Sequence, residues 1–296
     1  MSGFGINERK TKKSEEKKIR TLKRDKLISN AFSLHSSGKI KQAADIYNFL
    51  IQNKIYDPRV FNNLGSIYSN LKQFDKAILL FDESIKKFPN SPEAYINLAN
   101  VMVIKGKNDI AKKILNKVIE LNPKYLKPYS NMAGIFVGEG NFEKAEFFLR
   151  KSLEINPKDT NTLVNLACVL KDLGNPKQAE RFLRDALEIN PNYDSALVNL
   201  GAVLNELEKI DEGEQLLKKA LKINPNSPMA LNNLGNILSK KNKNKEAELF
   251  YRKAIELKSD FFLAYDNLGS LLSKQGNLIE AEKYTEKAIN FNPKFE

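Results

Sequence analysis

An asparagine recurs every 34 residues along most of this 296-residue chain. Seven of these asparagines keep the spacing with no insertion or deletion: Asn63, Asn97, Asn131, Asn165, Asn199, Asn233 and Asn267. Each is followed by Leu or Met and then by Gly or Ala. A fixed period of this length indicates an array of one repeated unit, whose neighbours stack to bury a common core. We therefore expect a binding site of this chain to be a long surface rather than a pocket.

One unit, residues 58–91, shows the pattern on which the fold prediction depends. Large apolar or small residues stand at its positions 4, 7, 8, 11, 20 and 24, and proline stands at position 32: Phe61, Leu64, Gly65, Tyr68, Ala77, Phe81 and Pro89. Positions 4, 7, 8 and 11 lie within about 100° of one another on a helical wheel, so they form one apolar stripe. Glycine at position 15, as in Gly106 and Gly174, is typical of a helix end, and the later proline ends a second helix. Each unit is therefore predicted to be a helical hairpin.

This order of residues resembles the tetratricopeptide repeat, and seven consecutive units keep its register. The register extends back over a degenerate first unit, in which Asn30 replaces the usual Leu and Ile55 stands in place of proline. The resemblance implies an all-α fold, a right-handed superhelical solenoid of eight 34-residue helix-turn-helix repeats. The expected units are 24–57, 58–91, 92–125, 126–159, 160–193, 194–227, 228–261 and 262–295, after a basic tail at 1–23.

The recurring asparagine, at position 6 of each unit, lies about 150° from the apolar stripe on the same helical wheel. In tetratricopeptide arrays this ridge of the first helix lines the concave groove, and the resemblance implies the same here. A carboxamide offers two donors and an acceptor, so a row of carboxamides can bond the backbone of an extended peptide. Such a row resembles the asparagine ladder in the repeat region of protein O-GlcNAc transferases. The seven asparagines are therefore our candidate peptide-binding residues, and shared ancestry by duplication or bonding between stacked helices are the alternatives.

No catalytic, metal or cofactor site is expected. His35 is the only histidine, so no histidine-based metal cluster or catalytic triad can form. Cys168 is the only cysteine and is expected to be a small packing residue rather than a nucleophile. A clamp for a C-terminal carboxylate is another known use of these repeats, but only Lys127 and Asn97 match its pattern. Four aromatic residues are expected in the stacking core: Phe142, Phe147, Phe148 and Phe182.

The net charge of +12 is unevenly distributed. Residues 1–26 hold ten Lys or Arg and four acidic residues, and their early part is predicted to be disordered. We interpret this segment as a solubilising tail, with contact to nucleic acid through it as the alternative. There is no run of 18 apolar residues and no apolar segment of a secretion signal, so no membrane partner is expected. The single cysteine favours a cytoplasmic location.

These observations predict a non-enzymatic interaction scaffold that binds an extended segment of another protein in its groove. One alternative is the substrate-targeting module of a glycosyl- or sulfotransferase-type enzyme whose catalytic part lies elsewhere. A weaker alternative is a nucleic-acid adaptor acting through the basic tail. Self-association through the last repeat is a further expectation, because its apolar residues match core positions of the preceding unit and have no repeat to cover them. These residues are Tyr284, Ala288, Ile289 and Phe291, and their counterparts are Phe250, Ala254, Ile255 and Leu257.

Overall fold

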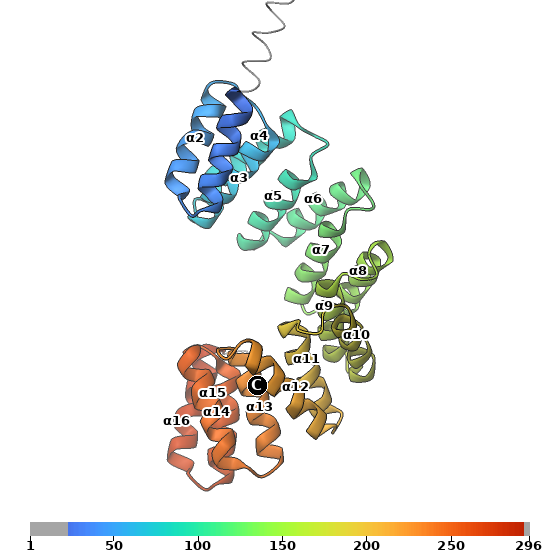
Figure 1. Ribbon diagram of the computed structural model, residues 1–296, viewed down its shortest axis with the longest axis vertical. Coiled ribbons are helices and arrows are strands. Elements are labelled where there is room, and N and C mark those ends of the chain that lie inside the picture. Colours follow the sequence, from blue (N-terminus) through green and yellow to red (C-terminus); the bar gives the residue numbers. More distant parts are fainter. Residues whose placement is uncertain (1–22, 293–296) are drawn as a thin grey trace, which may run out of the picture. The chain divides into compact units, whose positions relative to one another are not determined.

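The computed structural model describes residues 23–292, in which every regular element is a helix (Figure 1). The first helix spans 23–36, and fifteen more follow: α2 (Ile40–Gln52), α3 (Pro58–Asn70), α4 (Phe74–Lys87), α5 (Pro92–Ile104), α6 (Asn108–Leu121), α7 (Leu126–Gly138), α8 (Phe142–Ile155), α9 (Thr160–Asp172), α10 (Pro176–Ile189), α11 (Asp194–Glu206), α12 (Ile210–Ile223), α13 (Pro228–Lys240), α14 (Asn244–Leu257), α15 (Phe262–Lys274) and α16 (Leu278–Phe291). Most of the basic tail, up to residue 22, and residues 293–296 lie outside the described residues. Within the described residues, no helix has the length and apolar character needed to cross a membrane. The prediction of an all-α fold is confirmed.

The helix boundaries repeat with the period of the sequence. From α3 onward the first helices of successive units begin at residues 58, 92, 126, 160, 194, 228 and 262. The second helices begin at residues 74, 108, 142, 176, 210, 244 and 278. Proline occupies the first turn of α3 and α10, where its missing N–H is tolerated. The Asp57 side chain accepts a hydrogen bond from the Arg59 backbone N–H at 2.9 Å, which caps the start of α3.

The turn inside each hairpin has a left-handed backbone at position 15, whether or not glycine is present. The φ angle is +71° at Gly106 and +74° at Gly174, as the sequence predicts. It is also positive at Lys72 (+58°) and Glu208 (+59°), which have a Cβ atom. This conformation costs a residue with a Cβ about 1–2 kcal/mol. Packing of the two helices therefore imposes the turn in units where the local sequence does not favour it.

Small residues at position 8 bring the two helices of a hairpin close together. A Cβ atom at Gly201 would lie 2.5 Å from Leu217 Cγ, and one at Gly235 would lie 2.5 Å from the Tyr251 ring. Cβ atoms in folded proteins essentially never make contacts this short, so a larger residue at either position would force the partner side chain to shift. The prediction that small residues permit close approach of the helices is confirmed.

The chain divides into an N-terminal unit, up to Ile135, and a C-terminal unit, from Phe136. In the N-terminal unit, the first helix, α2 and α3 pack around side chains such as Tyr47 and Leu64, which are almost fully buried. In the C-terminal unit, one large cluster joins buried residues of the helices from α11 to α16, for example Leu217 and Leu268. Each unit therefore has its own apolar core.

Ion pairs join successive second helices of the C-terminal unit. Arg184 of α10 contacts Glu180 on its own helix at 2.8 Å and Glu212 of α12 at 2.7 Å. Arg252 occupies the equivalent position of α14 and contacts Glu280 of α16 at 2.9 Å. These arginines are 39–42% exposed, so each pair contributes modestly, but the pairs tie neighbouring repeats in the same geometry.

A third group of charges in the C-terminal unit centres on Glu214, which is 8% exposed. Its carboxylate contacts Lys218 at 2.6 Å and Lys241 at 2.8 Å. Hydrogen bonds from these two lysines lower the pKa of Glu214 to about 2. Folding therefore favours the charged form of this carboxylate.

Two expectations about the core were wrong. Phe147 is 54% exposed, although Phe142, Phe148 and Phe182 are half-buried. Leu257 is 41% exposed because position 30, in the last turn of the second helix, faces outward. Four of its counterparts are exposed as well, namely Leu121, Ile189, Ile223 and Phe291, whereas Ile155 is half-buried.

The last repeat does leave one core position uncovered. Ile255 in α14 is half-buried and packs into a cluster that includes Ala264 of α15. Ile289 occupies the equivalent position of α16 and is 51% exposed. Ile279, near the start of α16, is 86% exposed, but its equivalent Lys245 in α14 is exposed as well.

Candidate functional site

The seven ladder asparagines all lie away from the apolar cores of their hairpins. Six of their side chains are half-buried, and that of Asn165 is exposed. Each stands in the middle of a first helix, because the 34-residue register places position 6 there. The structure thus puts them on the polar ridge that the helical wheel predicts, and their role as peptide ligands stays a prediction.

In the N-terminal unit this ridge borders three cavities that share residues along α3, α5 and α7. The first cavity, about 460 Å³, and the second, about 240 Å³, share Ser66 and Asn97. The second and the third, about 360 Å³, share Asn100 and Ile104. The ladder residues Asn63, Asn97 and Asn131 each line at least one of them. We call the three adjoining cavities the first-helix groove.

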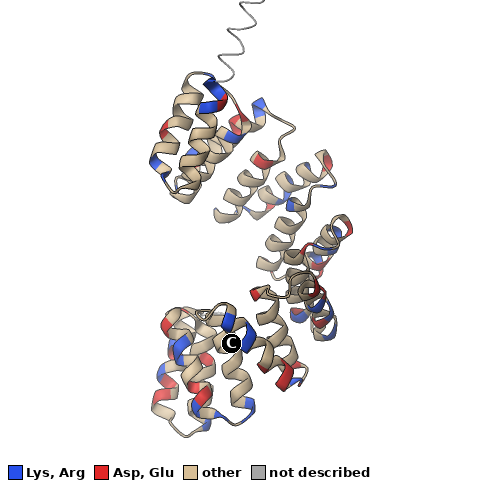
Figure 2. Cartoon of the chain, in the orientation of Figure 1, with Lys and Arg blue, Asp and Glu red and all other residues tan. Residues whose placement is uncertain are grey.

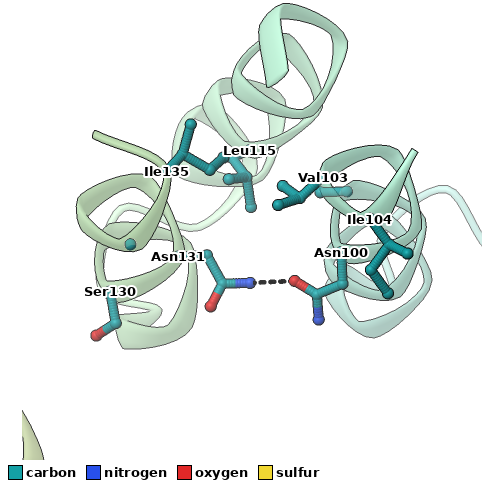
Figure 3. A pocket seen from close by; sticks show the side chains of 9 residues that line it. Asn100, Val103, Ile104, Leu115, Ser130, Asn131 and Ile135 are labelled. Atoms are coloured by element: carbon teal, nitrogen blue, oxygen red, sulfur yellow. Dashed lines mark hydrogen bonds between the residues drawn. The ribbon is translucent and has the colours of Figure 1, made fainter. Parts of the chain in front are cut away.

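Four of the seven ladder asparagines are already hydrogen-bonded to the preceding repeat. Asn63 Nδ2 donates to the Tyr47 hydroxyl at 3.2 Å, and Asn131 Nδ2 donates to Asn100 Oδ1 at 2.8 Å (Figure 3). In the C-terminal unit, Asn199 Oδ1 accepts from Cys168 Sγ at 3.4 Å, and Asn267 Nδ2 donates to Asn232 Oδ1 at 2.9 Å. These four asparagines contribute to contacts between stacked repeats. This agrees with the alternative, drawn from the sequence, that the asparagines bond between stacked helices.

The other three ladder asparagines alternate with these four along the chain. Asn97, Asn165 and Asn233 make no side-chain hydrogen bond within the described part of the chain. Each therefore presents two donors and an acceptor to whatever occupies the ridge. Asn100 and Asn131 also keep hydrogen-bonding capacity, because their mutual bond uses only the oxygen of Asn100 and one N–H of Asn131. The sequence did not reveal this alternation, since all seven asparagines occupy the same repeat position.

The first-helix groove carries few charges. The helices α5 and α7 contain one charged residue each, Glu93 and Lys127, and are otherwise uncharged (Figure 2). Glu93 accepts a hydrogen bond from the Ser91 hydroxyl at 3.0 Å, and Lys127 forms no ion pair among the described residues. Arg59, on the rim of the first cavity, is held by Asp57 at 2.7 Å, and this hydrogen bond lowers the pKa of the Asp57 carboxyl. A neutral ligand backbone fits this environment.

The two residues that match a carboxylate clamp do meet in the first cavity. Lys127 and Asn97 both line it, together with Asn62 and Ser66. The clamp pattern requires a lysine where Asn62 stands and an asparagine where Ser66 stands, so its full set of donors is not assembled. A cavity with one unpaired cation does not form that clamp.

Neither Cys168 nor His35 has the surroundings of a catalytic group. Burial raises the pKa of the Cys168 thiol, which favours the unreactive protonated form. The His35 ring lies edge-on to Tyr47, with 6.2 Å between the ring centroids. Among the described residues there is also no group of three or more His, Cys, Asp or Glu side chains that could hold a metal ion.

Comparison with protein families identifies the repeat. Models of the tetratricopeptide repeat match residues 69–135 and 136–204, residues 193–260 and residues 263–295. The chain belongs to the tetratricopeptide repeat family. A curated relative, the BBSome complex member BBS4 of Bos taurus, is 34% identical over 96 residues. That match covers 32% of this chain and 18% of the relative, so the chain spans less than a fifth of its length.

Solved structures share the fold of this tetratricopeptide repeat chain. The Cut9–Hcn1 hetero-tetramer of the APC/C gives a TM-score of 0.67 at 20% identity, covering 82% of this chain and 48% of the matched chain. YrrB, described as a TPR protein with an unusual peptide-binding site, gives a TM-score of 0.50 at 24% identity and covers 66% of this chain and 97% of its own. PilF of Pseudomonas aeruginosa gives a TM-score of 0.56 at 21% identity, and the match covers 69% of this chain and 92% of the PilF chain. Likenesses at this level of identity concern the fold alone.

Proposed function

We propose that this tetratricopeptide repeat chain is a non-enzymatic scaffold that binds an extended segment of another protein along its first helices. The observation that carries the proposal is the first-helix groove, whose three adjoining cavities bring Asn63, Asn97 and Asn131 onto one continuous surface. The groove is open, has few charges and is lined by carboxamides, which suits a neutral peptide backbone. YrrB, which shares the fold, is described as having a peptide-binding site, and this agrees with the proposal.

The spacing of the helices fits an extended ligand. Packed helices lie about 8–10 Å apart, and an extended chain advances about 3.3 Å per residue. One ladder asparagine would therefore meet the ligand about every third residue. A carboxamide can donate to a backbone C=O and accept from a backbone N–H, so this contact depends little on ligand side chains.

The hydrogen bonds of the ladder assign different tasks to its members. Asn97, which lines two cavities of the first-helix groove, has unused hydrogen-bonding groups and would bind the ligand directly. Asn165 and Asn233 have the same unused groups in the C-terminal unit. Asn63, Asn131, Asn199 and Asn267 are bonded to the preceding repeat and would mainly hold the repeats in register.

Two variants test this division with a library of random 12-residue peptides displayed on phage. Asn97→Ala should leave thermal unfolding unchanged. It should weaken peptides selected on the first-helix groove about two- to tenfold, because one lost hydrogen bond is worth about 0.5–1.5 kcal/mol. The matched control is Asn267→Ala, which removes the hydrogen bond to Asn232 in the C-terminal unit and should lower the unfolding temperature without changing the affinity. Retention of full affinity by Asn97→Ala would exclude the ladder as the binding surface of the groove.

The same groove would serve a chain that targets substrates to a glycosyl- or sulfotransferase. Co-purification of such an enzyme with the intact chain would distinguish that role from a simple scaffold. Nucleic-acid binding through the basic tail would instead give a gel shift that weakens steeply with salt.

A further inference from the structure

The third cavity of the first-helix groove differs from the other two in its lining. Four aliphatic residues line it: Val103 and Ile104 of α5, Leu115 of α6 and Ile135 of α7. As in the second cavity, no charged residue lines it. Figure 3 shows these apolar side chains beside the hydrogen bond that joins Asn131 to Asn100. We call this cavity of about 360 Å³ the anchor cavity.

Ile104 breaks the polar pattern of its ridge. It is 61% exposed, and the adjacent Val103 is 37% exposed. The residues that occupy position 13 in the other six regular units are polar or lack a side chain: Asn70, Gly138, Asp172, Glu206, Lys240 and Lys274. An isoleucine this exposed gains little from the core of its own chain. Apolar side chains that gather at an exposed cavity indicate contact with a partner.

Gly134 creates space in the same cavity. Its φ is not positive, so its backbone does not require glycine, and glycine inside a helix is less favourable than alanine. A Cβ atom added there would meet no other atom within 4 Å. The two preceding units have Ser66 and Asn100 at the equivalent position. The missing side chain therefore serves to keep the anchor cavity open.

We propose that the anchor cavity receives one uncharged apolar side chain of the bound segment. This inference rests on the proposed function and specifies the chemistry of its ligand. A charged side chain placed there would lose hydration without gaining a partner, because no lining residue is charged. The unused N–H groups of Asn100 and the oxygen of Asn131 lie beside the cavity and bond the ligand backbone next to the inserted side chain. The ligand is thus an extended segment with one fixed apolar anchor residue.

The test uses the full chain and the same displayed library of random 12-residue peptides. Peptides selected on the natural chain should share one apolar residue, and replacing it by alanine should weaken binding by about ten- to hundredfold. Gly134→Leu, which fills the cavity, should weaken the same peptides to a similar extent. In this variant the anchor-to-alanine change should have almost no further effect, because the two changes remove the same contact. Ile104→Asn should give a smaller loss, of about threefold, because it removes one wall.

The control is Lys113→Leu, which adds the same side chain at an exposed site on α6 that lines none of the three cavities. It should leave affinity unchanged, and far-UV circular dichroism of all variants should match the natural chain. Selected peptides that share a charged residue, or peptides that bind Gly134→Leu as tightly as the natural chain, would overturn the anchor while the ladder stands. Failure of the natural chain to select any peptide would overturn both the anchor and the proposed function.

Discussion

Two glycines in first helices should respond in opposite directions to the same substitution. Gly134 in α7 and Gly201 in α11 both have ordinary helical backbone angles. A Cβ atom would meet nothing within 4 Å at Gly134, but would lie 2.5 Å from Leu217 Cγ and 2.9 Å from Leu217 Cδ2 at Gly201. Replacement by alanine therefore has the same effect on the backbone at both sites. The two sites differ only in whether the new methyl group contacts another side chain.

The structure gives the sign and size of each effect. Alanine in place of glycine stabilises a helix interior by about 0.5–1 kcal/mol. Nothing opposes this gain at Gly134, so Gly134→Ala should raise the free energy of unfolding by that amount. At Gly201 the contact involves a fully buried leucine at the branch point of its side chain, which cannot rotate away. Overpacking of this kind costs about 1–3 kcal/mol, so Gly201→Ala should lower the free energy of unfolding by about 1 kcal/mol.

Urea denaturation followed by far-UV circular dichroism measures both changes against the natural chain. The midpoint should move to higher urea for Gly134→Ala and to lower urea for Gly201→Ala. The two sites lie in separate compact units and share no contact partner, so the double variant should show the sum of the two shifts. Midpoints that move in the same direction would refute the packing argument.

Three further predictions concern stability and association. Glu214→Gln should remove a contribution to the free energy of unfolding of up to about 3 kcal/mol. This contribution is present above pH 4.5 and lost as the pH falls toward 2, because the folded chain lowers the pKa of Glu214 from 4.5 to about 2. If the ion pairs are weak, urea denaturation will show a difference in stability between the two chains that does not vary with pH. Lys72→Gly should stabilise the chain by about 0.5–1 kcal/mol, because relief of the positive φ is partly offset by the greater conformational entropy that glycine loses on folding. A lowered unfolding temperature would contradict this. If the last repeat self-associates through Ile289, Ile289→Lys should shift sedimentation velocity profiles toward monomer, whereas unchanged profiles would exclude this side chain.

Much of the fold could be predicted from the sequence because the repeat constrains every unit in the same way. The apolar stripe of residues 58–70 and the small residue at position 8 gave the helix pair and its close contact, as at Gly201. Positions such as Leu257 were misjudged because apolar character alone does not show whether the next repeat covers a side chain. Coverage depends on the path of the following helices, which a helical wheel of one unit does not contain.

The candidate site could be placed on the correct face, but not in its details. All seven ladder asparagines have the same sequence position, and yet only some find a partner in the preceding repeat. Asn131 can bond Asn100 because that neighbour also carries a carboxamide, whereas Asn233 has Ala202 at the equivalent position. Such differences depend on pairs of residues in adjacent repeats. The anchor cavity likewise requires Ile104 and Gly134 to come together from two units.

The ion pairs between second helices affect how far a disturbance spreads along the chain. In a linear array, cooperativity depends on the coupling between neighbouring repeats relative to the stability of each repeat alone. Arg184 and Arg252 strengthen that coupling in the C-terminal unit by charge, and charge interactions between partly exposed groups weaken as ionic strength rises. Local opening of one hairpin should therefore involve its neighbours at low salt and remain confined to that hairpin at high salt. The length of chain that opens as one block becomes a property of the solvent as well as of the sequence.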